Sequence, residues 1–415
     1  MSDPVKGIEI PSFFVCPISL EIMKDPVTLS TGITYDRESI EKWLCNKKNN
    51  TCPITKQTLT DIELTPNHTL RRLIQSWCTI NAPFGIQRIP TPRLPISKSQ
   101  ILKLLQDSKT PNLQMKCLKR LKTIVLESDM NKRSVEAVGA ADYLVSIITN
   151  PNSNVTSSSP TGEFDNFLTA VDVAVTILYH LHLSQTSLKT LFGNNGEFVD
   201  QALTCSMQDE SRAYTVTLLK SMMEAAEPVQ MMSLKPQVFI ELKRVLVKQI
   251  SQKATKAALK LLIRVCPLGR NRIKIVEAGL VPVLVDTLLD GNEKRVIELV
   301  FMLLHQLCLC ADGRAELLEH GAGLAVVSKK IFRVSPAASE RAVKILHLIA
   351  KFSGNTSVIQ DMLQLGVVGK LCFLLQVDYC GGKIGEKARE ILKMHAMVWK
   401  NSSCIPDNLV SSYPS

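Results

Sequence analysis

A repeat of about 42 residues runs through most of this 415-residue chain and restricts its fold more than any other feature. The repeat is visible when apolar helical segments are aligned by their last six residues. These segments end at Leu126, His182, Met223, Cys266, Cys308, Ala350 and Ala396. The intervals are 56, 41, 43, 42, 42 and 46 residues. Because one such segment cannot bury its apolar face alone, successive units must stack into a continuous array.

A second series, of glycines that precede another apolar segment, keeps the same phase. These glycines are Gly139, Gly196, Gly279, Gly321 and Gly366. Gly196 and Gly279 are 83 residues apart, close to two periods, and the segment LKPQVFIELKRVL with Pro236 fills the midpoint. A sharp turn between helices often needs the positive φ or the close backbone approach that glycine permits.

Units of two or three helices with a glycine corner are typical of the armadillo and HEAT class of α-solenoid, which has a concave groove. An irregular helical bundle is the alternative, but it has no reason to keep two series in phase. We therefore expect a solenoid of six to seven units over residues 98–400. A polar insertion at 150–166 accounts for the one long interval, because Ser, Asn, Thr, Pro and Gly dominate it. We favour a passive insertion over a phosphorylated regulatory segment within 153–161.

The flanks of this array have a different composition. Residues 85–97, GIQRIPTPRLPIS, contain three prolines and predict a semi-rigid linker. Residues 401–415 are expected to form a flexible tail. The segment before the linker, residues 9–84, is then a separate small domain.

The charge and the apolar pattern narrow the class of protein. The net charge is +11, but Lys and Arg are spread through helical stretches, which indicates solvated faces, with an acidic partner as the alternative. Basic clusters with interleaved aromatics are absent from the sequence, so we expect no nucleic-acid partner. No apolar run approaches 18 residues, which argues against a membrane span. Most of the twelve cysteines lie in apolar helical patterns, which suits a reducing compartment, and we expect a cytoplasmic protein, with the nucleus left open.

Two Cys-Pro-Ile tripeptides, at Cys16 and Cys52, lie 36 residues apart in the N-terminal segment. That distance suits a domain with two zinc ions, which needs eight Cys or His ligands in close pairs. Residues 1–84 offer only Cys16, Cys45, Cys52, Cys78 and His68, without any CxxC pair. We therefore expect neither a metal nor another cofactor.

Packing and hydrogen bonds must hold this small domain instead. The stretch DPVTLSTGITYD alternates strand formers around a Ser-Thr-Gly turn and predicts a hairpin. Asp36 is expected to cap a helix whose apolar face carries Ile40, Trp43 and Leu44. A second helix is expected after Asn67. Its apolar face is predicted to be Leu70, Leu73, Ile74 and Trp77.

These residues resemble the U-box, the zinc-free relative of the RING domain. The resemblance rests on CPISLEIM from Cys16, DPV from Asp25, GITYDR from Gly32, and further on Ile40, Trp43-Leu44, CPIT from Cys52 and Pro66-Asn67. A U-box followed directly by armadillo repeats is similar to the compact subgroup of plant U-box ubiquitin ligases. The expected fold is mainly α, with a small α+β U-box before an armadillo-type solenoid.

The resemblance implies an E3 ubiquitin-protein ligase that carries no ubiquitin itself. It implies that a ubiquitin-conjugating enzyme, charged with ubiquitin, docks on Ile18, Leu20, Trp43 and Pro53. Lys56 takes the place of a basic residue that positions ubiquitin in related ligases, where Arg is frequent. The residues expected to act as U-box scaffold are Cys16, Glu21, Asp25, Asp36, Arg37 and Cys52. No catalytic nucleophile is expected.

The resemblance also implies partners for the repeats. A protein substrate is expected in the armadillo groove, and a homodimer is left open. The Trp and Asn array of nuclear-import adaptors is missing, since Trp399 is the only tryptophan after residue 77. The family acts in plant immune and stress signalling. The alternative is a non-catalytic scaffold with a retired U-box, but such a domain would be free to lose its docking residues, and all four positions are apolar here.

Overall fold

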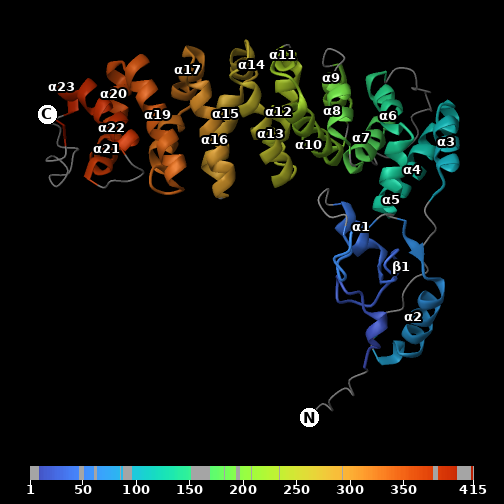
Figure 1. The fold of residues 1–415 in the computed structure, drawn as a ribbon. Helices are drawn as coiled ribbons and strands as arrows, with labels where there is room; N and C mark the ends of the chain where they lie inside the picture. The colour runs from blue at the N-terminus through green and yellow to red at the C-terminus, as the bar shows by residue number, and fades with distance from the viewer. Residues whose placement is uncertain are drawn as a thin grey trace. The chain divides into compact units, whose positions relative to one another are not determined.

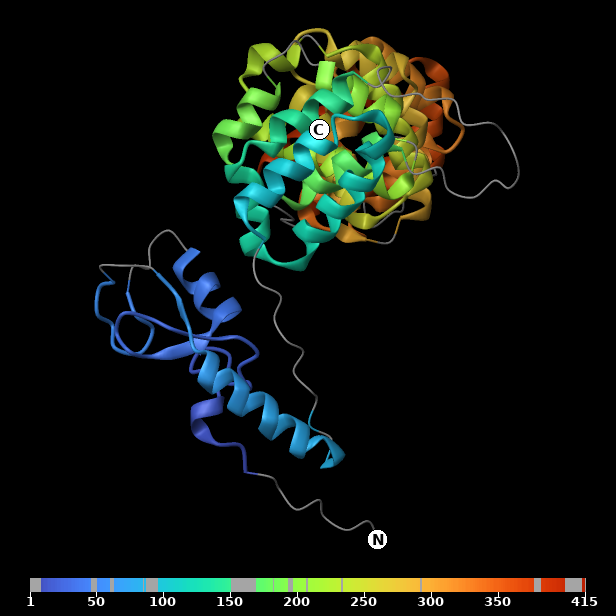
Figure 2. The same cartoon turned by 90° about the vertical axis from the view of Figure 1, so that its right-hand side faces the viewer.

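The computed structural model describes residues 9–45, 51–59, 63–84, 86, 96–150, 169–181, 183–192, 197–206, 208–232, 234–291, 293–376, 382–399 and 413–414 (Figures 1 and 2). The chain forms two compact units, Met1–Pro95 and Ile96–Ser415. The predicted insertion lies outside the described residues apart from Asn150, and so do most of the linker and tail. Each unit is described by itself.

The first unit is a small α+β domain. Its elements are η1 (Ser12–Phe14), β1 (Pro26–Thr28), β2 (Thr34–Asp36), α1 (Arg37–Cys45), β3 (Thr65–Pro66), α2 (His68–Ile80) and η2 (Ala82–Phe84). The antiparallel sheet has the order β2-β1-β3, with Val27 opposite both Tyr35 and Pro66. The predicted hairpin is confirmed as β1–β2, and Gly32 turns it with a φ of 79°.

The core of this unit differs from the expected pattern at one helix face. Ile40 of α1 is fully buried, and Trp43 and Leu44 pack against the core from partly buried positions. In α2, Ile74 is buried as predicted, but Leu73 is 53% exposed, so its assignment to the core face was wrong. Cys78, four residues after Ile74, fills the buried stripe instead. The start of α2 agrees with expectation, because the Asn67 side chain accepts the Leu70 amide.

The second unit consists of helices that stack in order. Seven long helices correspond to the segments that carry the repeat: α4 (Pro111–Glu127), α7 (Ala170–His180), α10 (Asp209–Ala225), α13 (Gln252–Val265), α16 (Lys294–Leu307), α19 (Pro336–Phe352) and α22 (Gly382–Met394). Each ends within two residues of the predicted position. Each packs against the next, so that they form one layer along the array (Figure 1).

The remaining helices supply the other layer of each unit. They are α3 (Lys98–Asp107), α5 (Asp129–Ala137), α6 (Ala140–Thr149), α8 (Gln185–Phe192), α9 (Glu197–Cys205), α11 (Pro228–Met232), α12 (Pro236–Lys248), α14 (Asn271–Glu277), α15 (Leu280–Asp290), α17 (Ala311–Glu319), α18 (Gly323–Lys330), α20 (Thr356–Gln364), α21 (Val367–Gln376) and α23 (Ala396–Trp399). A continuous core of Leu, Ile, Val and Ala side chains joins the layers from Ile101 to Tyr413. The solenoid expected from the repeat is therefore present.

The corner glycines act in two ways. Gly139, Gly279 and Gly366 have φ values of 78°, 71° and 69°, in the left-handed region that favours glycine. At the fourth corner the close approach is at Gly323, where a Cβ atom would lie 2.0 Å from the Leu317 carbonyl oxygen. Gly321, the glycine predicted for this corner, does not have a positive φ, and the space beside it is open. The glycine that this corner needs is thus two residues later than expected.

Within the described ranges, no single helix is both long and apolar enough to cross a bilayer, although α20 and α21, bent by 63°, meet the length and composition criteria as a pair.

Candidate functional site

The first Cys-Pro-Ile segment forms a tight loop before the hairpin. The Cys16 amide donates to the Glu21 carbonyl at 2.8 Å, and the Leu20 amide donates to the Cys16 carbonyl at 2.9 Å. Val15 and Ile22 close the loop as an antiparallel bridge. The base of the loop is therefore closed, and residues 17–20 form its tip.

The second Cys-Pro-Ile segment repeats this hydrogen-bond pattern. The Cys52 amide donates to the Gln57 carbonyl and the Lys56 amide to the Cys52 carbonyl, both at 2.9 Å. A bridge between Thr51 and Thr58 closes this loop in turn. The domain thus contains two loops of the same construction, as expected of two knuckles without metal.

Both loops contain a residue with left-handed backbone at the same position. Leu20 has a φ of 58° and Lys56 a φ of 59°. A non-glycine residue in this region is disfavoured by about 1–2 kcal/mol. Backbone strain of this kind persists where the surrounding structure holds it, and it concentrates at functional sites.

The predicted docking residues occupy the two loops and α1. Leu20 is 77% exposed, whereas Ile18, Trp43 and Pro53 are partly buried. Ile18 and Trp43 also pack against the core of the unit, so part of each side chain supports the fold. The Trp43 Nε1 atom donates to the Thr51 carbonyl at 2.9 Å, which fixes the indole beside the second loop.

Ile54 was missed in the sequence and is 51% exposed in the second loop. It follows Cys52-Pro53 as Ile18 follows Cys16-Pro17, so the repeated tripeptide was the signal that could have identified it. Lys56 is exposed, and its Nζ atom lies 5.6 Å from the centre of the Trp43 ring. A lysine at this distance makes a cation–π contact, which holds the ammonium group next to the predicted docking residues.

A charged network fixes the first loop to the start of α1. One carboxylate oxygen of Asp36 accepts the amides of Lys24 and Asp25 at 2.8 and 3.0 Å. Asp36 directly precedes α1, but its side chain accepts no amide of the helix, so the expected capping bond is wrong. Arg37 donates to the Asp25 carboxylate at 2.6 Å, and Arg71 lies 3.8 Å from the same carboxylate. The side chain of Glu21 is exposed, and Glu21 supports the first loop through its backbone carbonyl, which accepts the Cys16 amide.

The two loop cysteines are fully buried acceptors of hydrogen bonds. The Cys16 sulfur accepts the Asp36 amide at 3.3 Å, and the Cys52 sulfur lies 3.0 Å from the Tyr35 hydroxyl and accepts the Thr31 hydroxyl at 3.4 Å. Burial raises the pKa of Cys52, but hydrogen bonds from Thr31, Thr55 and Tyr35 outweigh it and lower that pKa to about 6. The two sulfur atoms thus organise neighbouring segments through hydrogen bonds.

The described residues contain no group of three or more His, Cys, Asp or Glu side chains that could hold a metal ion. The polar contacts of Asp36, Cys16 and Cys52 connect the two loops, β2 and α1. The resulting arrangement is a pair of rigid loops beside a partly buried tryptophan, with apolar side chains and one lysine exposed. Such a surface can bind another protein, and the two loop cysteines within it are fully buried.

Comparison with known proteins agrees with this architecture. A U-box domain model matches residues 10–82, and a model of the plant U-box protein ARM repeat region matches residues 99–415. Similar proteins from Arabidopsis thaliana include E3 ubiquitin-protein ligase PUB23, 53% identical over 98% of both chains, and E3 ubiquitin-protein ligase PUB22, 51% identical over 98% of this chain and 99% of its own. E3 ubiquitin-protein ligase PUB24 is 35% identical over 99% of this chain and 97% of its own. A small domain with two metal-free loops, an armadillo-type solenoid and this similarity over nearly the full length lead to one assignment: the chain belongs to the plant U-box and armadillo-repeat family of E3 ubiquitin-protein ligases.

Proposed function

We propose that the two loops and α1 bind a ubiquitin-conjugating enzyme charged with ubiquitin, and that the armadillo unit holds the substrate whose lysine accepts it. The exposed position of Leu20 is the observation that carries this proposal. A leucine that is 77% exposed on strained backbone contributes little to the fold, but it offers apolar area to a partner.

The docking surface combines apolar anchors with a rigid support. Leu20 of the first loop and Ile54 of the second supply exposed aliphatic area, and the partly buried Trp43 supplies aromatic area beside the second loop. Since the Nε1 atom of Trp43 is already bonded to Thr51, the indole loses little further freedom on binding. Aromatic residues in such positions dominate the energy of many interfaces.

Transfer would proceed directly from the conjugating enzyme to the substrate lysine. Cys16, Cys52 and Cys78, the described cysteines of the U-box, are fully buried and cannot accept ubiquitin from a partner. The ligase would then act by restricting the flexible ubiquitin thioester to orientations open to attack, which is an effect of positioning.

Lys56 is the residue that we assign to ubiquitin positioning. Its ammonium group lies at the edge of the docking surface, over Trp43, where a carbonyl of ubiquitin and one of the conjugating enzyme could both reach it. Arginine would offer a planar fork of donors for two acceptors, whereas lysine is a point charge. We therefore expect Lys56→Arg to increase the rate of transfer and Lys56→Ala to decrease it.

A second copy of the chain is a further partner in this proposal. Phe13, Ile80 and Phe84 of the U-box unit are 61%, 73% and 63% exposed, and a second copy could cover this apolar area. Sedimentation at several concentrations tests this; a wild-type monomer at all of them would refute the homodimer.

The cellular setting is proposed on narrower grounds. All cysteines whose state the structure describes are free thiols, which supports a cytoplasmic location, with the nucleus also open. Immune or stress signalling is proposed from the family resemblance alone. A loss-of-function plant with unchanged responses to pathogens, drought and salt would refute that role.

The test of the ligase mechanism is ubiquitin-chain synthesis by the full chain with activating and conjugating enzymes. We expect Leu20→Ala and Trp43→Ala to abolish or strongly reduce chains, as Ile18→Ala should if its fold persists. Val229→Ala is the matched control, since Val229 is 73% exposed but lies on α11 of the armadillo unit. A wild-type protein inactive with several conjugating enzymes would favour a non-catalytic scaffold, and an active Leu20→Ala variant would refute the docking surface.

A further inference from the structure

An open cavity of about 240 Å³ lies at the junction of two successive armadillo units. One side is Gly291, directly after α15, with Lys294 and Ile297 at the start of α16. The other side is the end of α18 and its connection to α19. Lys329, Lys330, Arg333 and Val334 line that side. The cavity wall thus contains four cationic side chains and no carboxylate.

These four cations have no ion-pair partner among the residues that the structure describes. Two acidic residues close in sequence to Lys294, Glu293 and Glu298, make ion pairs with other cations. Glu298 accepts a hydrogen bond from Ser335 at 2.8 Å and pairs with Arg295 at 3.0 Å, so both of its carboxylate oxygens are in use. Glu293 pairs with Lys256 of α13. No described carboxylate therefore makes a direct ion pair with the cavity cations, although the charge of Lys294, after the hydrogen bond from Ser335, helps to lower the pKa of Glu298.

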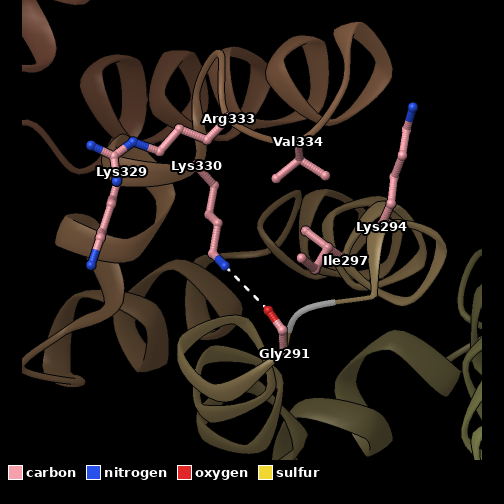
Figure 3. A pocket seen from close by; sticks show the side chains of 7 residues that line it. All are labelled: Gly291, Lys294, Ile297, Lys329, Lys330, Arg333 and Val334. Carbon is pink, nitrogen blue, oxygen red and sulfur yellow. Dashed lines mark hydrogen bonds between the residues drawn. The ribbon is translucent and has the colours of Figure 1, made fainter.

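Lys330 extends across the cavity towards the Gly291 carbonyl (Figure 3). That hydrogen bond is long, at 3.4 Å, whereas Lys274 and Lys370 donate to the carbonyls of Leu234 and Ser328 at 2.6 Å. Burial lowers the pKa of Lys330, and the neighbouring charges of Lys329 and Arg333 lower it further. An anion in the cavity would relieve this repulsion and give Lys330 a stronger acceptor than the carbonyl.

The backbone between these cations is strained. Phe332 has a φ of 65°, which an aromatic side chain rarely adopts. The Phe332 amide donates to the Ser339 hydroxyl at 3.0 Å, and its ring packs edge-on against Phe373 at 5.3 Å. The strained residue lies between Lys330 and Arg333, so its conformation determines how their side chains diverge around the cavity. Strain that the surroundings maintain so firmly is a frequent mark of a binding site.

We propose that this cavity binds a phosphorylated serine or threonine side chain of the protein substrate. The inference rests on the proposed substrate role of the armadillo unit. Arg333 would offer a planar pair of donors to two phosphate oxygens, and Lys330 would add a further cationic donor. A dianion matches this site better than a carboxylate does, because four cationic residues line one cavity without a lining carboxylate.

Ile297 and Val334 form an apolar wall next to the cations. This wall favours a peptide over a free inorganic ion, since the methylene or methyl group of a phosphorylated side chain can contact it. An extended peptide also suits a solenoid, whose repeated units present a long surface with equivalent sites. The predicted phosphate site would select a substrate by its state of modification.

The experiment measures binding of fluorescent peptide pools to the full chain by anisotropy. The pools are degenerate except for a central phosphoserine, phosphothreonine or unmodified serine. The pocket variant is Lys330→Gln with Arg333→Gln. Its control is Lys260→Gln with Arg270→Gln, which removes two exposed cations of the same unit outside the cavity lining. Both variants lose the same charge.

We expect the phosphorylated pools to bind roughly tenfold or more tightly than the serine pool, and the pocket variant to lose that preference while the control keeps it. Equal binding of all pools, or an equal loss in both variants, would overturn the proposal. So would binding to vesicles of phosphatidylcholine and phosphatidylserine without a preference among peptides. Ubiquitin-chain synthesis without substrate is measured in parallel. If it fails in the wild type, the ligase mechanism fails; if it proceeds without phosphopeptide preference, only this inference fails.

Discussion

The left-handed backbone of Leu20 leads to an unusual prediction about its substitution by glycine or alanine. At most positions glycine is less stable than alanine by about 0.5–1 kcal/mol, because the unfolded glycine chain is more flexible. At a φ of 58° alanine must instead bear a conformational penalty of about 1–2 kcal/mol that glycine avoids. The difference reverses the usual order, so Leu20→Gly should be more stable than Leu20→Ala by about 0.5–1 kcal/mol.

Relative to the wild type, Leu20→Gly should change the stability of the U-box very little. The side chain is 77% exposed, so its removal loses about 0.5 kcal/mol of burial, a quarter of the value for a buried leucine. Glycine also relieves the strained backbone, and this gain exceeds the stability lost through the more flexible unfolded chain. The net gain is about equal to the lost burial, so the two nearly cancel. Leu29→Ala is the reference for real core loss, since Leu29 is 3% exposed and its truncation should destabilise the unit by about 2–4 kcal/mol.

Docking should not follow the order of stability. If Leu20 is buried against a conjugating enzyme, both Leu20→Gly and Leu20→Ala lose about 1.5–3 kcal/mol of interface energy, which reduces chain synthesis roughly tenfold or more. Lys56 supplies a matched backbone control in the second loop, with a φ of 59°. Lys56→Gly should likewise be more stable than Lys56→Ala.

Hydrogen exchange of the full chain, followed on peptides that cover β1 and α2, measures U-box stability separately from the repeats. Chain synthesis is measured on the same samples, with the conjugating enzyme well below saturation. Alanine equal to or more stable than glycine at both positions would refute the left-handed backbone. A Leu20→Gly protein as active as wild type would show that the strain serves something other than docking.

Three further predictions concern the scaffold. Asp36→Ala should destabilise the U-box by about 2 kcal/mol, because two backbone amides lose a charged acceptor, and the same exchange measurement should detect it, whereas Glu21→Ala, with an exposed side chain, should not. The pKa of Cys52 is about 6 in the fold and higher in the unfolded chain, which therefore binds more protons between these values, so U-box stability should rise from pH 6 to 9 by up to about 4 kcal/mol and fall as the pH drops through 6. Cys52→Ser should reduce this slope without abolishing it, because hydrogen bonds, against the effect of burial, also lower the pKa of Cys16; urea titrations at several pH values can establish both. Incubation with a strong chelator should leave both U-box exchange rates and chain synthesis unchanged, and a loss of either would contradict metal-free scaffolding by Asp36 and the loop cysteines.

The features that could be predicted from the sequence are those with a period or a local motif. The ends of the seven long helices that carry the repeat were predicted to within two residues, because burial against both neighbours imposes an apolar pattern on each helix. Gly139, Gly279 and Gly366 were identified for a similar reason, since a sharp corner demands a backbone that only glycine adopts readily. One corner was assigned to the wrong glycine, Gly321 instead of Gly323. Gly323 is required there by a close backbone approach and not by a positive φ, and the sequence does not distinguish two glycines of the same segment.

The features that could not be predicted from the sequence depend on contacts between residues that are far apart in the chain. Asp36 precedes α1 as a capping residue would, yet its carboxylate bonds to Lys24 and Asp25, amides brought close only by the hairpin. Lys294 and Arg333 are 39 residues apart and belong to separate helical stretches, so each resembled an ordinary solvated cation. One repeat length brings them to the same junction, beside Lys330. In a solenoid, charges one period apart become neighbours, and a spread of cations that contains no local cluster can therefore still build an anion site.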